Sequence, residues 1–586
     1  MTEVADHLAE LREKWRAAWP AHLPAAPTYP YGKAPLTEYL RQWARRRPGH
    51  PCVNFYGREL TYAEIDRLSD AFAAFLLSRG CGAGTRVGVH PGNCPQFVIA
   101  FYGILKAGAV HVPVNPMFKP AELTYELTDA GVQLLVTLDS LAEVVRPALD
   151  GTAVRTVVVT SLGEYLPESP TLPVPFAAGA PEPVAFDGVA TRTPPDFVRG
   201  NHHGPVQVRT FAEALSAAPA VKPVAPRLED LAALNYTGGT TGMPKGCEHT
   251  HGDMLYTAAT ATTYGSGAAQ DDVSLVAIPI FWIAGENGGL LNPIFTGSTV
   301  VLLNRWDPDA VLAAIGTYRV TGMVATVDGY VELMERPGFA DRDLTSLRYT
   351  AAMSFVRKLS PELRRAWSER PNTGGVLREG AYGMTETHTS DTITAGFQDD
   401  DHDLKSQPVF CGIPVPGTDV MIRDFDTGEP KPADAEGEIV IRTPSLTRGY
   451  WNKPDATAAA IRDGWLHTGD IGCLDADGCL HFLGRAKEML KVNGMSVFPS
   501  EIEVLLGRNE AVEGCGVIGV DDPRTGQRPR AYVTLRAEAD LDAAALAEWC
   551  RANMATYKVP EIRIVDHLPL TATGKVIKHR LEKEFE

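Results

Sequence analysis

The sequence lacks several features that would assign it to common classes of protein. Its nine cysteines include no Cys-x-x-Cys pair, and the spacing of the closest two, Cys473 and Cys479, is unlike that of a zinc site. No apolar run reaches the length of a membrane span. Residues 1–20 mix acidic and basic side chains, as a short amphipathic helix does, and contain no apolar signal-peptide core. These absences predict a cytoplasmic protein with reduced thiols and no stable membrane insertion.

Positive charge is also scarce. The chain has 55 Lys and Arg residues against 72 Asp and Glu residues, a net charge of -17. This balance argues against general binding to nucleic acid or to anionic membrane surfaces, although local lysines can still bind an anionic ligand. A chain of 586 residues is too long to fold around a single hydrophobic core, so we expect two or more domains. The sequence leaves the oligomeric state open, a homodimer included.

Strand and helix patterns alternate in the first quarter of the chain. We expect helices over residues 60–77, 97–106 and 122–130, and strands over 86–90, 110–116 and 132–138. Such alternation predicts an α/β fold with parallel-rich sheets and flanking helices. Residues 161–225 differ, because prolines recur there and no helical or strand period persists. For this segment we predict a long irregular excursion.

A Gly/Thr-rich stretch, Tyr236 to Lys245, follows an apolar segment that predicts a buried strand. Its small residues are Thr237, Gly238, Gly239, Thr240, Thr241 and Gly242. Successive backbone N–H groups in such a loop can form an anion-binding concavity, and Lys245 adds a positive charge. It is not a Walker A loop, because Met243 and Pro244 separate Gly242 from the lysine. Taken alone, the stretch is equally compatible with a flexible surface turn.

Further signatures follow this stretch in a fixed order. They are Ala381-Tyr-Gly-Met-Thr-Glu386, Asp463 to Asp470, Gly484 to Gly494, and Leu568 to Lys575. Together with the Gly/Thr stretch they resemble the adenylate-forming superfamily of acyl-CoA synthetases, peptide-synthetase adenylation domains and beetle luciferases. The resemblance covers nearly the whole chain after about residue 35. It implies a large N-terminal domain (1–484) and a small, mobile α+β C-terminal domain (485–586).

The resemblance also implies a nucleotide site. The Gly/Thr stretch with Lys245 would bind phosphates, and Ala381, Tyr382, Gly383, Met384 and Thr385 would bind the nucleotide. Within that set, Tyr382 would stack on adenine and Thr385 would bind the α-phosphate. Glu386 would coordinate Mg²⁺, which suits a carboxylate beside phosphate oxygens. On its own, Thr-Glu is more typical of a helix start.

Asp470 and several later residues complete the implied site. The Asp470 carboxylate can accept hydrogen bonds from both ribose hydroxyls. By resemblance, Arg485 also contacts the ribose and Lys487 lies at the domain hinge. Lys491 and Gly494 would belong to a loop that enters the site for a second half-reaction. Lys575 would be the catalytic lysine of adenylation, offsetting negative charge in the transition state.

Some positions depart from the family's pattern. Trp282 stands where relatives usually carry His, and Ala351, Ala352 and Met353 stand where Gly-Gly-Ala is typical. We expect these four residues to shape the acyl pocket, with a plain core aromatic as the alternative for Trp282. Glu286 and Asp328 are also unusual. A buried carboxylate is costly unless paired, so we expect both to face water, or else to bind a polar part of the substrate.

The expected activity is ATP-dependent activation of a carboxylic acid to acyl-AMP, with release of pyrophosphate, followed by transfer to CoA. The partners are thus ATP, Mg²⁺, CoA and a small-molecule acid, generically a fatty or branched aliphatic one. Three alternatives remain open: an acyl-AMP ligase that loads a carrier protein, a luciferase-like oxygenase, and a catalytically inactive nucleotide-binding homologue. Retention of all the charged signature residues argues against the last.

Overall fold

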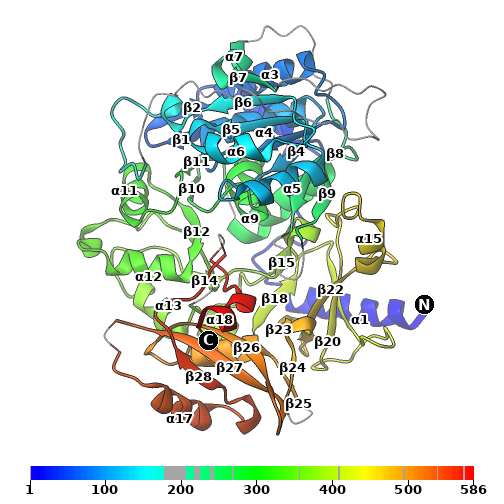
Figure 1. Cartoon of the computed structure of the whole chain (residues 1–586), viewed down its shortest axis with the longest axis vertical. Helices are drawn as coiled ribbons and strands as arrows, with labels where there is room; N and C mark the ends of the chain where they lie inside the picture. Colours follow the sequence, from blue (N-terminus) through cyan, green and yellow to red (C-terminus); the bar gives the residue numbers. More distant parts are fainter. Residues whose placement is uncertain are drawn as a thin grey trace.

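A computed structural model describes residues 2–176, 206–216, 225–237, 243–266, 269–355, 357–406, 409–492, 495–537, 539–571 and 574–585. Two seven-stranded sheets form the upper and middle parts of the molecule in the view of Figure 1. The first has the order β14-β13-β12-β10-β11-β1-β2 and the second β7-β6-β5-β3-β4-β8-β9. Strands pair in parallel in both sheets except at the edges β1–β2 and β8–β9.

The strands of the first sheet are β1 (Pro51–Phe55), β2 (Arg58–Thr61), β10 (Val273–Val276), β11 (Thr299–Leu302), β12 (Gly322–Thr326), β13 (Tyr349–Met353) and β14 (Leu377–Glu379). Those of the second are β3 (Arg86–Val89), β4 (Val110–Pro113), β5 (Leu134–Leu138), β6 (Thr156–Thr160), β7 (Gln207–Thr210), β8 (Leu231–Tyr236) and β9 (Gly246–Thr250). The helices expected between them are α3 (Tyr62–Ser78), α4 (Pro95–Lys106) and α5 (Pro120–Ala130). The predicted alternation is therefore confirmed.

The excursion predicted over residues 161–225 is not irregular throughout. Within its described parts, β7 adds a parallel strand to β6, and α7 (Phe211–Ser216) buries Phe211 beside Phe72 of α3. Both elements are too short to show a period in the sequence, which explains why the pattern missed them. Residues 177–205 and 217–224 lie outside the described residues.

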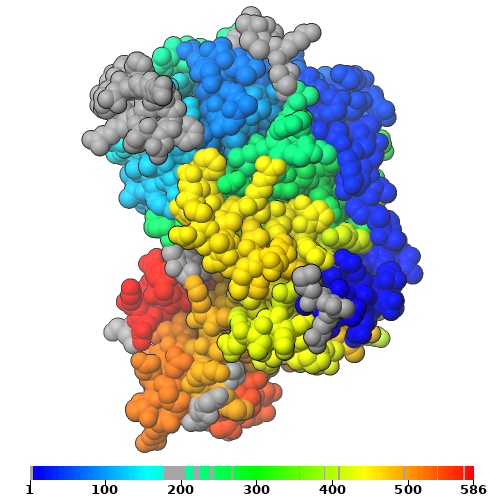
Figure 2. Space-filling model, turned by 90° about the vertical axis from the view of Figure 1, so that its right-hand side faces the viewer, coloured from blue at the N-terminus to red at the C-terminus, as the bar shows by residue number. Residues whose placement is uncertain are grey.

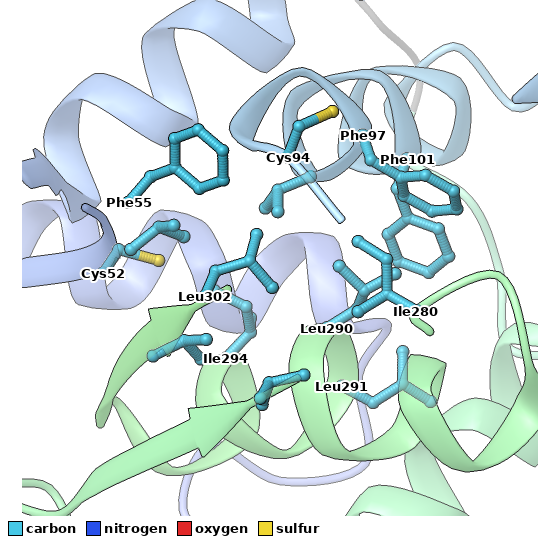
Figure 3. Close-up of a cluster of buried hydrophobic side chains, with 14 of the residues drawn as sticks. Cys52, Phe55, Cys94, Phe97, Phe101, Ile280, Leu290, Leu291, Ile294 and Leu302 are labelled. Carbon is cyan, nitrogen blue, oxygen red and sulfur yellow. The ribbon is translucent and has the colours of Figure 1, made fainter. Parts of the chain in front are cut away.

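Helix α4 lies in the main hydrophobic core. Every one of its residues is buried, which agrees with its apolar character on all sides. Figure 3 shows Phe97 and Phe101 of α4 pointing toward Ile280, Leu290 and their neighbours. These partners belong to η4 (Asn287–Leu291), to α10 (Asn292–Thr296) and to the turn after β10. The core therefore joins helices of one sheet to strands and helices of the other.

A third, antiparallel sheet has the order β17-β18-β23-β22-β20-β19, with β21 (Ile461–Arg462) beside β22. Its strands are β17 (Thr392–Ile393), β18 (Phe410–Pro414), β19 (Asp419–Arg423), β20 (Gly437–Arg442), β22 (Trp465–Leu474) and β23 (Leu480–Arg485). The expected N-terminal helix, α1 (Thr2–Ala18), covers this sheet. Trp15 donates to the Gly478 carbonyl at 2.9 Å, and Arg12 pairs with Asp419 at 2.8 Å. Figure 2 shows this dark blue segment against the yellow-green residues.

The C-terminal residues form a five-stranded sheet with helices α16 (Pro499–Leu506), α17 (Ala543–Asn553) and α18 (Lys578–Phe585). Its strands are β24 (Leu490–Val492), β25 (Met495–Val497), β26 (Val512–Asp522), β27 (Gly526–Leu535) and β28 (Glu561–Ile564). This sheet has its own hydrophobic cluster and forms the orange-red lobe at the bottom of Figure 1. Sheet membership changes between β23 and β24, beside the predicted boundary at residues 484–485.

Candidate active site

The Gly/Thr stretch connects the antiparallel strands β8 and β9. At its ends, the Thr237 N–H donates to the Lys245 carbonyl at 2.9 Å, and the Lys245 N–H donates to Thr237 Oγ1 at 3.2 Å. These bonds close the base of the loop. Residues Gly238, Gly239, Thr240, Thr241 and Gly242, which the sequence predicts as phosphate-binding, lie outside the described residues.

Tyr450 joins the loop to the expected metal ligand. The Lys245 ammonium lies 4.2 Å from the centre of its ring, and its hydroxyl donates to Glu386 Oε1 at 2.8 Å. Glu386 lies in the short helix η6 (Thr385–Thr387). Its backbone carbonyl accepts from the Thr447 N–H at 2.8 Å. The sequence interpretation gave Tyr450 no role. The available signal was the run Arg448-Gly-Tyr-Trp-Asn452, which itself belongs to the ordered series of signatures.

Tyr382, Asp470 and Arg485 form a second cluster. The Tyr382 hydroxyl donates to Asp470 Oδ2 at 2.6 Å, and Arg485 Nε lies 3.2 Å from Asp470 Oδ1. Burial raises the pKa of Asp470, and the Arg485 charge opposes that shift. Ala381 precedes Tyr382, and Gly383 and Met384 form the short strand β15 that leads into η6. One chain segment therefore connects Tyr382 to Thr385 and Glu386.

Lys575 reaches this cluster from the C-terminal lobe. Its ammonium lies 5.4 Å from the ring centre of Phe355, which follows β13. Burial lowers the pKa of Lys575, the positive charge of Arg485 lowers it further, and Asp470 opposes both effects. Lys575 is thus within electrostatic range of Asp470 and Arg485, from which about a hundred residues of sequence separate it.

Lys487 and Lys491 lie elsewhere. Lys487 is exposed in η8 (Ala486–Glu488), in the segment that joins the third sheet to the C-terminal lobe. Lys491 is exposed on β24, and its N–H donates to Gln527 Oε1 at 2.9 Å. Figure 1 places β24 at the bottom of the molecule, away from β9 and α9 (Ile283–Glu286). Gly494 lies outside the described residues.

Glu286 does not face water, which corrects the expectation from sequence. It is fully buried, accepts from Asn235 Nδ2 at 2.8 Å, and lies 3.4 Å from His388 Nε2. Burial alone would raise its pKa, but the nearby imidazole of His388 and the hydrogen bond from Asn235 bring the pKa below its usual value. The ring of His388 meets that of His249 edge-on, with 4.5 Å between ring centres. A single polar position in the sequence could not reveal these distant partners.

This buried network reaches the nucleotide-site turn. His249 Nε2 donates to the Thr385 carbonyl at 2.7 Å, and His388 follows η6 directly. Asn287, next to Glu286, donates from Nδ2 to the His388 carbonyl at 3.0 Å. The turn that carries Thr385 and Glu386 therefore rests on α9 and β9.

One face of β12 and β13 is accessible. Along both strands, buried residues alternate with partly exposed ones, and Val324 in the interior strand β12 is 36% exposed. We call the set Val324, Tyr349, Ala351, Met353 and Arg378 the accessible face. Ala352 is not part of it. Neighbouring strand residues point to opposite sides, and Ala352 is fully buried in the core.

Two further acyl-pocket expectations concern Trp282 and Asp328. Trp282 is half-buried at the start of α9, with its ring edge-on to Phe281 and 5.9 Å between centres. It packs against the main core, as the plain-aromatic alternative requires. Asp328, at the start of α12 (Val327–Glu335), is half exposed and lies 3.5 Å from Arg357 Nε. Burial raises the pKa of Asp328, and Arg357 opposes the shift.

The donor set fits a magnesium–phosphate ligand. Mg²⁺ is commonly bound through one or two carboxylates together with substrate phosphates. Glu386 supplies one carboxylate, and Tyr450 occupies only its Oε1. Lys245 and Lys575 add two positive charges near the same region. The arrangement is suited to binding and polarising a polyphosphate.

Comparison with known proteins agrees with this geometry. Residues 40–451 match the family model described as AMP-binding enzyme, and residues 501–575 match the AMP-binding enzyme C-terminal domain. The chain therefore belongs to the AMP-binding enzyme family. This confirms the predicted membership of the adenylate-forming superfamily and its α/β fold class.

Full-length relatives support the same class. The chain is 33% identical to a long-chain-fatty-acid–CoA ligase of Bacillus subtilis (strain 168), with 98% of both chains covered. It is 30% identical to a feruloyl-CoA synthase of Amycolatopsis sp, covering 92% of this chain and 97% of the relative. An anthranilate CoA ligase, AuaEII, solved with anthranoyl-AMP, aligns with a TM-score of 0.77 and 26% identity over 96% of this chain and 99% of that one.

These similarities confirm the predicted class of activity, acid activation through an acyl adenylate with formation of an acyl-CoA. ATP use is likewise supported, since a structural neighbour at 25% identity was solved with ATP bound, with a TM-score of 0.73 over 94% of this chain and 99% of that one. Within the described residues, no helix combines the length and apolar character needed to cross a membrane.

Proposed function

We propose that this chain is an AMP-forming acid–CoA ligase. In the first half-reaction, a substrate carboxylate oxygen attacks the α-phosphorus of ATP, and pyrophosphate leaves. In the second, the CoA sulfur attacks the acyl carbonyl, and AMP leaves with the carboxylate oxygen. The observation that supports the proposal is the Tyr382–Asp470–Arg485 cluster, which one chain segment joins to the turn that holds Thr385 and Glu386 and whose charges act on Lys575.

The residues divide the first half-reaction among them. Lys245 and the Gly/Thr loop, Gly238 to Gly242, hold the phosphates; Tyr382 stacks on adenine; and Asp470 with Arg485 holds the ribose. Thr385 contacts the α-phosphate. Bound at Glu386, Mg²⁺ would neutralise phosphate charge. Lys575 stabilises the charge that develops at the α-phosphate, so that catalysis consists mainly of positioning and electrostatics.

The second half-reaction needs a different arrangement. Lys491 is exposed on β24, which Figure 1 draws at the bottom of the molecule, away from β9 and α9. We infer that the C-terminal lobe turns about Lys487, withdraws Lys575 and brings Lys491 and Gly494 to the site. Such gating by domain motion is common in enzymes with two chemical steps. The change would also open the site to the CoA thiol.

The proposal is tested by pyrophosphate release from ATP over a panel of fatty, branched and aromatic acids, with and without CoA. We expect acid-dependent release, with CoA raising turnover and yielding AMP and thioester. Acid-dependent release that CoA does not affect would instead indicate a carrier protein as acceptor. ATP binding without release for any acid would overturn the proposal in favour of an inactive homologue.

The names of the relatives include long-chain-fatty-acid and feruloyl ligases, which favours an acid with a long aliphatic or an aromatic acyl group. The accessible face of β12 and β13 offers Val324, Ala351 and Met353 for contact with such an acyl group. Trp282 remains the candidate for shaping its entrance.

A further inference from the structure

Arg378, which is partly exposed, differs from the buried arginines Arg86 and Arg364 in how it is paired. Arg364 is held by the carboxylates of Asp401 and Asp403, at 3.0 and 2.6 Å. Arg86 donates from all three guanidinium nitrogens to the backbone carbonyls of Gly84, Ala130 and Gly131. Within the described residues, Arg378 has a single partner, the Gly265 carbonyl, which accepts from its Nη2.

Burial lowers the pKa of Arg378, and the charged or titratable groups that oppose the shift are the phenols of Tyr349 and Tyr330. A guanidinium nonetheless stays protonated in proteins. The chain therefore keeps a positive charge on a partly exposed side chain, and two of its guanidinium nitrogens have no acceptor among the described residues. A ligand that covers this charge would leave it unpaired unless the ligand itself supplies an acceptor.

The position of Arg378 connects it to the acyl group. In the parallel register, Arg378 pairs with Ala351, and Ala351 pairs with Val324. Residues in register on adjacent strands point to the same side of a sheet, so all three belong to the accessible face. Met353, two residues further along β13, lies nearer the ends of the strands, beside Phe355 and Lys575. Ala351, and with it Arg378, lies about 7 Å further from the strand ends than Met353, because a strand rises roughly 3.3 Å per residue.

Nearby carboxylates are already occupied or directed elsewhere. Glu379, the next residue, accepts from the Ser354 N–H at 3.1 Å and from the Ser354 hydroxyl, and it is in register with the core residue Ala352. Asp328 faces Arg357. Asp272, below the strands, pairs with Arg348. The acceptor for Arg378 is therefore not among the described acidic residues around it.

We propose that Arg378 binds an anionic oxygen group at the far end of the acyl chain, so that this enzyme prefers acids carrying a second carboxylate. The inference rests on the proposed function, since it places the acyl group on the accessible face. A guanidinium offers a planar pair of N–H donors that matches a carboxylate. A plain hydrocarbon chain would leave those donors unpaired, and a site built for hydrogen bonding rejects a ligand that lacks the acceptor.

A purely structural role for Arg378 makes a different prediction. Gly265 lies at the end of the helix Ala261–Ser266, and arginines often bond the last carbonyls of helices. If capping were the only role, replacing Arg378 would lower the melting temperature and affect all acids alike. Substrate selectivity separates the two roles, because capping does not distinguish one acid from another.

The test compares acids of equal chain length that end in methyl, hydroxyl or carboxylate, using pyrophosphate release as the readout. Wild type is expected to favour the dicarboxylic acids. Arg378→Met keeps the length of the side chain and removes the donors, so kcat/KM for the diacids should fall about tenfold or more relative to the methyl-ended acids. Arg378→Lys should retain part of the preference. Arg365→Met, at an exposed position of α13 (Pro361–Ser368), is the matched control.

The outcomes separate the two proposals. Acid-dependent release with the same ratio of diacid to monoacid activity in wild type and Arg378→Met would overturn this inference and leave the ligase proposal intact. A preference for hydroxyl-ended acids over diacids would overturn the anionic specificity. Release with no acid at all would overturn both. If Arg378→Met fails to fold, the ratio in Arg378→Lys decides, because an unchanged ratio and activity there would contradict a guanidinium–carboxylate contact.

Discussion

Asp470 and Arg485 face each other across the adjacent strands β22 and β23, as register partners whose side chains meet at 3.2 Å. Arg485 is the last residue of β23, after which the chain leaves the third sheet for the C-terminal lobe. Both side chains shift the pKa of Lys575, in opposite directions. The pair therefore lies where the two parts of the molecule meet, and it is available to a ligand held between them.

Asp470→Asn should weaken nucleotide binding. An amide offers one acceptor oxygen in place of two, so it cannot accept from both ribose hydroxyls while it bonds Tyr382. We expect KM for ATP to rise about tenfold, in line with loss of a hydrogen bond to a charged group. The ATP dependence of pyrophosphate release measures the effect, with the exposed Asp477→Asn as control. An unchanged KM in the folded variant would count against the ribose role.

Tyr450→Phe should impair Mg²⁺-dependent binding of ATP while preserving the contact with Lys245. The ring stays under the ammonium, but the hydroxyl that donates to Glu386 is lost. Without that bond the carboxylate is less well oriented, and we expect about a tenfold rise in the Mg²⁺ concentration for half-maximal activity. Magnesium titration at fixed ATP reports this, with Tyr557→Phe in the C-terminal lobe as control. Equal titration curves would remove Tyr450 from the site.

Lys575→Ala should separate the half-reactions. Loss of the ammonium removes charge stabilisation from adenylation, so acid-dependent pyrophosphate release should fall by at least about a hundredfold. Thioester formation from supplied acyl-AMP and CoA should persist, since Lys575 is withdrawn in the proposed second conformation. The exposed Lys583→Ala on α18 is the control. If a folded Lys575→Ala variant loses both activities, the proposed division of labour is wrong.

Arg357→Ala should destabilise the position of the C-terminal lobe seen in the structure relative to the turned position proposed for the second half-reaction. Arg357 lies 3.5 Å from Asp328 and 3.8 Å from Glu513 on β26, so it bridges the first sheet region and the C-terminal lobe. Such an ion pair contributes up to about 1 kcal/mol, which limits the effect to roughly fivefold. Adenylation should slow while thioester formation from acyl-AMP does not. Glu513→Ala should reproduce the change, and additive effects in the double variant would disprove the coupling.

Asp391→Asn should flatten the dependence of stability on pH. Asp391 Oδ2 accepts from the Thr387 hydroxyl at 2.7 Å, and burial raises the pKa of its carboxyl to about 8. The folded state then keeps a proton that the unfolded chain releases near pH 4. The contribution of protonated Asp391 to the free energy of unfolding is complete below about pH 4. It is lost as pH rises toward 8, by at most about 1.4 kcal/mol per pH unit.

Urea denaturation between pH 5 and pH 9 measures this effect. Wild type should lose more stability over that range than Asp391→Asn, and the exposed Asp540→Asn should follow wild type. Parallel curves for wild type and Asp391→Asn would show that Asp391 is ionised in the folded state throughout.

Local pattern was enough to predict many elements. Helical spacing predicts a helix over 60–77, and the structure shows α3 starting at Tyr62 with a full capping box, in which Thr61 Oγ1 accepts from the Glu64 N–H at 3.2 Å. The strands β3, β4, β5 and β8 were predicted within a few residues, because parallel strands buried on both faces read as short apolar runs. The roles assigned to Lys245, Glu386, Asp470 and Lys575 remain predictions, which the variants above test.

Contacts between distant segments could not be predicted in the same way. The sequence interpretation left Glu286 in water, gave Tyr450 no role and treated Ala352 as a pocket residue. Local pattern does not specify the partners of Glu286, which are Asn235 and His388. It does not specify those of Tyr450, which are Lys245 and Glu386. Nor does it decide which side of β13 Ala352 faces.

The sequence by itself determined the class of fold, the family and the order of the chemical signatures, because periodicity and motif spacing are properties of neighbouring residues. Only the tertiary structure decided which charges are paired. Arg364 is buried against two carboxylates, whereas Arg378 is partly exposed and bonds a single carbonyl. Pairing depends on which strands and helices pack together, and a ligand that covers an arginine without a carboxylate partner must itself supply an acceptor.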